Sequence, residues 1–445
     1  MSFVLHRKFD DSLPTMVRGE GNYLIDSNGK RYFDACGGAA VSCLGHSENR
    51  VRDAIISQLG KAAFAHTGFF TNEPTERLAE RLIKAAPPGT GNGRAMFLGS
   101  GSEAMEAALK LARQYHLERG QPSRGRTISR RSSYHGNTLG ALSVGGHAGR
   151  RAPYAPLLTD CDHIDPCYDY RFRWEGETEE AFGLRMANQL AEKIAEVGAD
   201  NVAAFVAEPI VGATLGSQPA ASGYFRRIRE ICDETGVLFV ADEVMCGSGR
   251  TGTLFALEQE GVHADLVTMA KGLGAGYQPI AAVIASQDVC DAIGRGSGQL
   301  WNGHTYMSHA VVCAGALAVL DVMEDDDLLS NVRETGRYLE TQLRAVFGQH
   351  SHVGDIRGRG LFWSLELVQD RSTKTPFAKE DAVANRLKAA ALSHGMLCYP
   401  AQGCADGNAG DHVLLAPPYA VTRAEVDLIV GRLGEALSDT LEAVA

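Results

Sequence analysis

Long apolar segments are absent from this sequence of 445 residues, and no apolar run approaches the 18 residues of a membrane-spanning helix. The first residues, MSFVLHRKFDD, also lack the apolar stretch of a signal peptide. The sequence therefore predicts a soluble protein of the cytoplasm that does not interact with a membrane.

A surplus of basic residues is missing as well. Lys and Arg total 43 and Asp and Glu total 54, which gives a net charge of −11. Nucleic acids and anionic membranes bind to basic surfaces, so neither is expected as a partner. A small anionic ligand needs only a local pocket and is not excluded.

Metal-binding and dinucleotide-binding patterns are also absent. The ten cysteines form no C-x-x-C pair and no cluster with histidine at metal spacing, so reduced thiols and no metal are expected. The fingerprint G-x-G-x-x-G does not occur after the first strand, because Ala104 stands where a third glycine would follow Gly99 and Gly101. A dehydrogenase is therefore not expected.

Short apolar runs that alternate with helical patterns are present instead. The runs at 201–210, 237–241 and 265–270 are typical of buried strands, and an amphipathic helix separates the first two. This alternation predicts an α/β fold with a large doubly wound, mostly parallel sheet domain.

The two chain ends have a different pattern. A hairpin is expected around Asn28-Gly29, and short strands and helices alternate after residue 350. We expect both ends to form one smaller α+β domain. The predicted domains are an N-terminal segment of the small domain at 1–60, the large domain at 61–315 and the C-terminal part of the small domain at 316–445.

Two opposite charges follow neighbouring predicted strands. Asp242 ends one apolar run, and Lys271 ends the next, 29 residues later. That distance fits one strand-helix-strand crossover, so both side chains would lie at the edge of the sheet where α/β proteins bind ligands. A desolvated lysine there could act as a nucleophile or form a Schiff base, and the carboxylate could hold a protonated pyridine nitrogen. A surface lysine and a strand-end aspartate remain the alternative.

A helix start beside this edge could hold an anion. Ser100 and Glu103 form a capping box, which puts Ser100, Gly101 and Ser102 at the amino end of a helix. Free amide groups, hydroxyls and the helix dipole would favour a phosphate there, although a plain helix cap is an open alternative.

Two further residues follow predicted strands. Tyr134 comes after the strand at 126–129 and could lie flat on an aromatic cofactor, or it could pack on the surface. Glu208 ends the strand at 201–210. A long apolar helix is expected to start at Thr305.

These motifs together resemble the class III, fold type I pyridoxal-phosphate aminotransferases, the family of ω-amino acid, amine and acetylornithine transaminases. The resemblance runs nearly from end to end, and DEVMCGSGRTG and TMAKGLGAGYQPI are its most specific stretches. The matching positions are Ser100-Gly101-Ser102, Tyr134-His135-Gly136, Glu208-Pro209, Asp242-Glu243-Val244, Lys271 and Thr305.

The resemblance implies a role for each residue around the cofactor ring. Lys271 would form the Schiff base with pyridoxal 5'-phosphate and move the proton, and Asp242 would hold the protonated ring nitrogen. Tyr134 and Val244 would cover the two faces of the ring.

The resemblance also implies contacts farther from the ring. Ser100, Gly101 and Ser102 would bind the phosphate, and Thr305 would reach the phosphate of a neighbouring subunit in a homodimer. His135 is counted among the cofactor-binding residues, and Glu208 would lie near the substrate or its carboxylate partner.

Several positions depart from the family pattern. Gly407-Asn408-Ala409 stand where many relatives have an arginine that binds the acceptor carboxylate. Arg357 and Arg359 are substitutes by residue type, although their RGRGLF motif is more typical of a structural role. Ala39-Ala40 would make a small pocket wall that suits a bulky substrate, and Ser248 replaces a phenylalanine.

The predicted enzyme is an aminotransferase that moves an amino group from a primary amine or ω-amino acid to pyruvate or 2-oxoglutarate. Because the arginine is missing, an amino-acid racemase or epimerase on the same scaffold is the alternative. A regulatory protein that only binds the cofactor is not favoured, since the sequence has no basic face or DNA-binding appendage.

Overall fold

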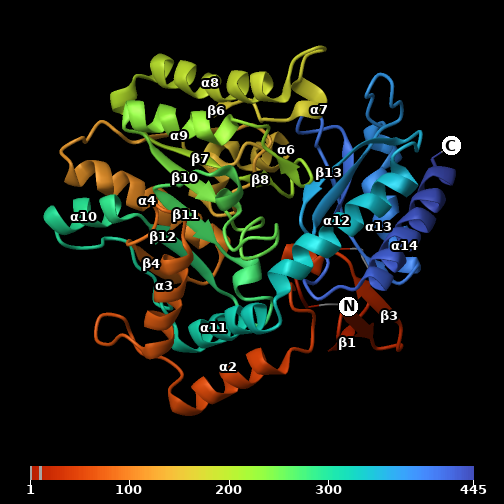
Figure 1. Ribbon diagram of the computed structural model, residues 1–445, viewed down its shortest axis with the longest axis horizontal. Coiled ribbons are helices and arrows are strands. Elements are labelled where there is room, and N and C mark those ends of the chain that lie inside the picture. The colour runs from red at the N-terminus through yellow and green to blue at the C-terminus, as the bar shows by residue number, and fades with distance from the viewer. Residues whose placement is uncertain (1–2, 10–12, 445) are drawn as a thin grey trace.

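The computed structural model describes residues 3–9 and 13–444 (Figure 1). A large sheet and the helices around it fill the left of Figure 1, and strands from both chain ends lie together at the right. The parts of the predicted N-terminal and C-terminal segments at 1–2, 10–12 and 445 lie outside the described residues.

The large sheet has the strand order β4-β12-β11-β10-β7-β5-β6. Only β12 runs antiparallel to its neighbours, β4 and β11, so the mostly parallel α/β fold is confirmed. Asp242 is paired with Thr268 at the carboxyl ends of β10 and β11. The strands are β4 (Arg94–Leu98), β5 (Arg126–Arg130), β6 (Asp162–Ile164), β7 (Val202–Ala207), β10 (Leu238–Asp242), β11 (Leu266–Met269) and β12 (Ala281–Ala285).

Helices cover both faces of this sheet because its central strands are apolar on both sides. In β10, Leu238 and Val240 belong to the core on the face covered by α4 (Gly101–Glu118). Phe239 points to the other face, where its ring stacks on Phe225 of α9 (Tyr224–Thr235). The neighbouring α8 (Glu179–Val197) packs on α9.

A long apolar helix follows the lysine loop, but it does not begin at Thr305 as predicted. α11 (Ala310–Asp325) begins five residues later, because the His309 side chain caps it by accepting from the Val311 amide at 3.3 Å. Thr305 lies in an exposed turn, and Ser308 has a left-handed φ of 55° that interrupts the helical path. The other helices of this lobe are α2 (Asn49–Lys61), α3 (Glu73–Ala85), α5 (Leu139–Val144), α6 (Ala148–Arg151), α7 (Asp169–Phe172) and α10 (Gln287–Arg295).

The two chain ends share one sheet of the small lobe. The predicted hairpin forms at Asn28-Gly29, where Asp26 accepts hydrogen bonds from the amides of Asn28 and Lys30 at 2.9 Å. The sheet order is β1-β2-β3-β15, and β15 pairs in parallel with β3. Its strands are β1 (Met16–Glu20), β2 (Tyr23–Asp26), β3 (Arg31–Asp34) and β15 (Met396–Leu397). The domain bounds at residues 60 and 315 stay a prediction.

A second sheet of the small lobe, in the order β13-β14-β17-β16, is antiparallel. The last helix begins at the predicted capping box of Thr422 and Glu425. The remaining α-helices and strands are α1 (Gly37–Ala40), β8 (Ile210–Val211), β9 (Gln218–Pro219), α12 (Leu328–Phe347), β13 (Val353–Arg359), β14 (Phe362–Leu367), α13 (Val383–Ser393), β16 (Tyr399–Gln402), β17 (Asp411–Leu415) and α14 (Arg423–Glu442).

Candidate active site

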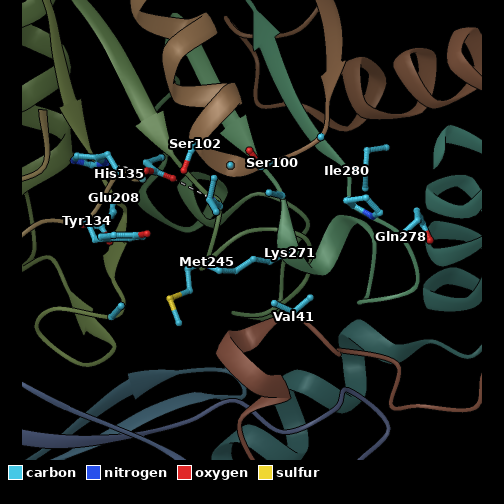
Figure 2. A pocket seen from close by; sticks show the side chains of 18 residues that line it. Val41, Ser100, Ser102, Tyr134, His135, Glu208, Met245, Lys271, Gln278 and Ile280 are labelled. Atoms are coloured by element: carbon cyan, nitrogen blue, oxygen red, sulfur yellow. Dashed lines mark hydrogen bonds and ion pairs between the residues drawn. The ribbon is translucent and has the colours of Figure 1, made fainter. Parts of the chain in front are cut away.

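A cavity of about 290 Å³ lies at the carboxyl edge of the large sheet (Figure 2). It brings together nine of the ten predicted site residues, and Thr305 is not among the residues that line it. The nine are Ser100, Gly101, Ser102, Tyr134, His135, Glu208, Asp242, Val244 and Lys271. Sequence reasoning missed Val41, Met245, Gln278 and Ile280, which also line the cavity.

Lys271 enters the cavity from a tight turn after β11. Its backbone has a left-handed φ of 46°, which a residue other than glycine adopts at a cost in free energy. Burial lowers the pKa of the Lys271 amine below its ordinary value, although the negative charges of Asp242 and Glu208 oppose this shift. The amine is therefore more readily neutral, and more nucleophilic, than that of a surface lysine.

The departure at Ser248 lies behind this turn. A Cβ atom added to Gly272 would be 3.1 Å from Cβ of Ser248 and 3.2 Å from the hydroxyl of Tyr419. That hydroxyl donates a hydrogen bond of 2.8 Å to the Ser248 carbonyl. Ser248 therefore helps to pack the lysine turn and does not line the cavity.

Asp242 is a buried carboxylate, 3% exposed, with fixed hydrogen-bond donors. One oxygen accepts from the Val244 amide at 3.0 Å and from the Thr268 hydroxyl at 3.3 Å. The other lies 2.7 Å from Nδ1 of His135. These contacts hold the carboxylate in one orientation at the cavity wall, where it could bind a protonated nitrogen of a ligand.

The amino end of α4 forms an anion-binding corner of the cavity. The Ser100 hydroxyl accepts a hydrogen bond from the Glu103 amide at 3.2 Å, as the predicted capping box requires. The Glu103 carboxylate accepts from the amide of Gly99 at 2.7 Å, whereas a capping box would use the amide of Ser100. The amides of Gly101 and Ser102 belong to the first turn, whose N–H groups have no acceptor within the helix, and they remain available for an anion.

Glycine is required at two places in this corner. A Cβ atom at Gly101 would lie 2.9 Å from Cγ1 of Val244, and one at Gly136 would lie 2.7 Å from the Ser102 hydroxyl oxygen. Gly136 also has a left-handed φ of 138°. The glycines therefore bring the helix end, Val244 and the Tyr134 loop close together.

Glu208 joins the Tyr134 loop to the cavity floor. Its carboxylate accepts from the Tyr134 amide at 3.4 Å and from the Gly212 amide at 3.3 Å. Burial raises the pKa of Glu208 above its ordinary value. Figure 2 shows Tyr134, His135 and Glu208 on one side of the cavity and Gln278 and Ile280 on the opposite side.

Both arginines considered as carboxylate ligands are already paired. Arg357 is buried and forms ion pairs with Asp355 at 2.8 Å and Glu366 at 2.7 Å. Arg359 pairs with Glu260 at 2.9 Å. Neither lines the cavity, so neither is placed to bind a carboxylate there.

The predicted small wall at Ala39-Ala40 is also wrong in detail. The residue that lines the cavity there is Val41, directly after α1, and Figure 2 shows it across from Lys271. Ala40 is buried, with a left-handed φ of 61°. The irregular backbone of 38–40 was not visible in the sequence pattern, and it moves the wall by one residue.

Across residues 3–9 and 13–444, no group of three His, Cys, Asp or Glu side chains could hold a metal ion. In that same part of the chain, no helix is both long enough and apolar enough to cross a membrane.

A partly buried lysine, a buried carboxylate and a helix amino end meet around one cavity of this sheet, which is the arrangement expected of a pyridoxal-phosphate enzyme of fold type I. The sequence matches the class-III aminotransferase family over residues 5–437, and the chain belongs to that family.

Relatives with this fold are known from sequence and from structure. The chain is 44% identical to an uncharacterized aminotransferase of Schizosaccharomyces pombe, over 97% of this chain and 94% of that protein. It is 36% identical to an uncharacterized aminotransferase of Bacillus subtilis, over 98% of each. It is also similar to the omega transaminase of Pseudomonas jessenii in complex with PMP, with a TM-score of 0.90, 34% identity and coverage of 97% and 94%.

Family membership confirms that the protein is an enzyme and an aminotransferase. None of these three relatives is a racemase, so the racemase alternative receives no support from them. The substrates and the roles of the individual site residues stay predictions.

Proposed function

We propose that this protein binds pyridoxal 5'-phosphate and transfers an amino group from a primary amine or ω-amino acid to an oxo acid, either pyruvate or 2-oxoglutarate. The observation that carries this proposal is that Lys271, Asp242 and the amino end of α4 line one cavity. An aldehyde, a ring nitrogen and a phosphate of one ligand require these three kinds of group.

The residues of the cavity fit this cofactor. The free amides of Gly101 and Ser102, with the hydroxyls of Ser100 and Ser102, would hold the phosphate. Asp242 would hold the protonated ring nitrogen, and Lys271 would form the Schiff base. When bound, pyridoxal phosphate supplies an electron sink for the carbon that carries the amino group.

The protein's own side chains would position this chemistry. Lys271, whose pKa is lowered by burial, would take up and return the substrate proton. His135 would keep Asp242 oriented through the 2.7 Å contact. Tyr134 and Val244 would confine the ring from opposite sides, and Glu208 would lie near the substrate.

We further propose a homodimer in which Thr305 reaches the phosphate of the other subunit. Thr305 is exposed in this chain and does not line its own cavity. Beside it, the Tyr306 and Phe64 rings pack edge to face at 5.6 Å and are 70% and 42% exposed. Exposed aromatic residues next to a site residue are typical of an interface. The cytoplasmic location stays a prediction.

The test is a half-reaction of the cofactor-loaded protein with single amines, followed by the visible absorption band. A wild-type protein that is a transaminase loses this band when a donor amine is added. Lys271→Ala should keep its fold but lose the chromophore that borohydride fixes, and its turnover should fall on the order of 10³-fold or more.

Lys110→Ala is a matched control, because Lys110 is an exposed lysine on α4. It should keep both chromophore and turnover. Full activity in Lys271→Ala would refute the catalytic assignment, and a band that no amine bleaches would refute the transaminase itself.

A further inference from the structure

An oxo acid acceptor carries a carboxylate, and the cavity has no evident partner for it. Among the described residues that line the cavity there is no arginine, and the basic groups are Lys271 and His135. Both are engaged by the chemistry proposed above. The loop with Gly407-Asn408-Ala409 offers no cation either, because none of these three residues is basic. The Asp406 carboxylate accepts hydrogen bonds from the amides of Asn408 and Ala409 at 2.8 and 2.7 Å, which holds the loop in a tight turn.

Arg150 lies over the ring of Tyr134, a residue that lines this cavity. It is exposed on α6, and its guanidinium carbon is 4.7 Å from the centre of the Tyr134 ring, which lines the cavity. Within the part of the chain that the structure describes, no ion pair or side-chain hydrogen bond involves its guanidinium. The adjacent Arg151 differs, because it donates to main-chain carbonyls, including that of Gly145 at 2.7 Å.

The position of α6 places this arginine beside the loop that lacks one. A Cβ atom at Gly407 would be 3.3 Å from Cβ of Ala148, and one at Gly149 would be 3.4 Å from the Gly407 carbonyl oxygen. The small residues at 148, 149 and 407 therefore allow α6 and the loop to touch. An arginine on α6 is thus a direct neighbour of the loop that lacks one.

The charge of Arg150 also reaches the reactive groups. Its positive charge contributes to the lowered pKa of Lys271, after the larger effect of burial. It contributes in the same way to the lowered pKa of His147, which lies three residues away. A cation that influences Lys271 across the cavity would also attract an anionic substrate.

We propose that Arg150, held over the Tyr134 ring, binds the carboxylate of the oxo acid acceptor. This inference rests on the proposed function and adds a specificity-determining residue to it. A guanidinium can bind a carboxylate through two parallel hydrogen bonds while its flat face stays on an aromatic ring. The geometry thereby assigns to α6 the role that the 407–409 loop lacks.

The experiment compares two acceptors that differ only in the carboxylate. Protein loaded with pyridoxamine phosphate is mixed with pyruvate or with acetaldehyde, and the return of the visible band gives a second-order rate constant for each. In Arg150→Gln the constant for pyruvate should fall roughly 10- to 100-fold, because a charged hydrogen-bonded pair is lost, while that for acetaldehyde stays near the wild-type value. Arg150→Lys should recover part of the loss.

Arg119→Gln is the matched control. Arg119 is also exposed and lies over a tyrosine ring, 5.2 Å from Tyr115, but at the opposite end of α4 from the anion-binding corner. In Arg119→Gln, the ratio of the rate constants for pyruvate and acetaldehyde should equal the wild-type ratio.

A binding measurement gives a readout that does not depend on turnover. Lactate has the carboxylate of pyruvate but cannot accept an amino group, and its Kd for the cofactor-loaded protein should rise in Arg150→Gln. An unchanged lactate Kd, or an equal loss with pyruvate and acetaldehyde, would overturn the proposal and leave the transaminase intact. A wild-type protein whose visible band returns with none of pyruvate, 2-oxoglutarate and acetaldehyde would overturn both proposals.

Discussion

Among single residues, Asp242 and Lys271 are coupled through their charges. The negative charge of Asp242 raises the pKa of the Lys271 amine, whereas burial lowers it and is the larger effect. The two residues therefore set together how readily the amine loses its proton. The strand-end pattern predicted that they would share one edge of the sheet, and their contacts with one cavity agree with this.

Replacing Asp242 by asparagine should shift the titration of Lys271 to lower pH. The substitution removes the charge that raises the pKa, and burial continues to lower it. We would measure the pH at which an acylating reagent labels Lys271 to half its maximum in cofactor-free protein, by mass spectrometry of the peptide. Lys271→Ala shows that the label is specific. A half-labelling pH that stays constant or rises would contradict the electrostatic coupling.

Sequence patterns located the polar site residues better than the apolar ones. Asp242 is the last residue of β10, Glu208 directly follows β7, and Tyr134 lies in the loop after β5. The two carboxylates stand out because each ends an apolar run. Met245 and Ile280 are apolar residues within apolar surroundings, so nothing in the sequence separates cavity wall from core. Val41 depends on the irregular backbone of α1, which no periodic pattern describes.

Among the elements, α14 and α12 each contain an interior glycine, and the space around these two glycines differs. Gly431 of α14 is exposed, and a Cβ atom there would meet nothing within 4 Å. Gly336 of α12 is buried, and a Cβ atom there would overlap the carbonyl oxygen of Gly360. Replacing glycine by alanine should therefore stabilise the protein at one of these positions and destabilise it at the other.

Gly431→Ala should raise the free energy of unfolding by about 0.5–1 kcal/mol, because alanine loses less backbone entropy in a helix. Gly336→Ala should lower it by about 1–3 kcal/mol, because α12 would be forced away from Gly360. Urea unfolding followed by circular dichroism measures both. Equal effects of the two substitutions would show that the contact with Gly360 does not limit the packing of α12.

Helix starts were predicted less well than helix interiors. The caps at Ser100 and Thr422 are visible as a serine or threonine three residues before a glutamate. The start of α11 was missed because its cap is His309, whose ring nitrogen accepts the hydrogen bond instead of a hydroxyl. The turn that contains Thr305 has no sequence signal that separates it from the apolar helix.

In the whole molecule, the proposed dimer makes each site depend on two subunits. Lys271→Ala subunits and Thr305→Val subunits should each be weakly active alone at limiting cofactor. When they are mixed after partial unfolding and reassembly, activity should return. In a mixed dimer, the Thr305→Val subunit keeps its own Lys271 and receives an intact Thr305 from the other subunit.

The size of the recovery tests where Thr305 acts. Random pairing makes about half of the dimers mixed, and each has one intact site, so roughly a quarter of the wild-type activity is expected. Sedimentation confirms that the mixture is dimeric. No recovery would mean that Thr305 serves the cavity of its own chain or neither cavity.

The architecture of the large lobe could be predicted because each strand and helix carries its own local pattern. The small lobe is different, since β15 has only two residues and pairs with a strand from the other end of the chain. Its pairing with β3 follows from long-range packing and not from local sequence. The sequence supported the expectation that both chain ends contribute short strands and helices to one small domain, but not which strands would pair.

The pairing of Phe33 in β3 with Met396 in β15 has a consequence for synthesis in the cell. A ribosome adds roughly 5–20 residues per second, so the first strands wait on the order of tens of seconds before their partner is made. During that time the edge of β3 is open to other chains. Chaperones that bind nascent polypeptides would therefore be needed most for the first strands made, because their sheet is among the last to be completed.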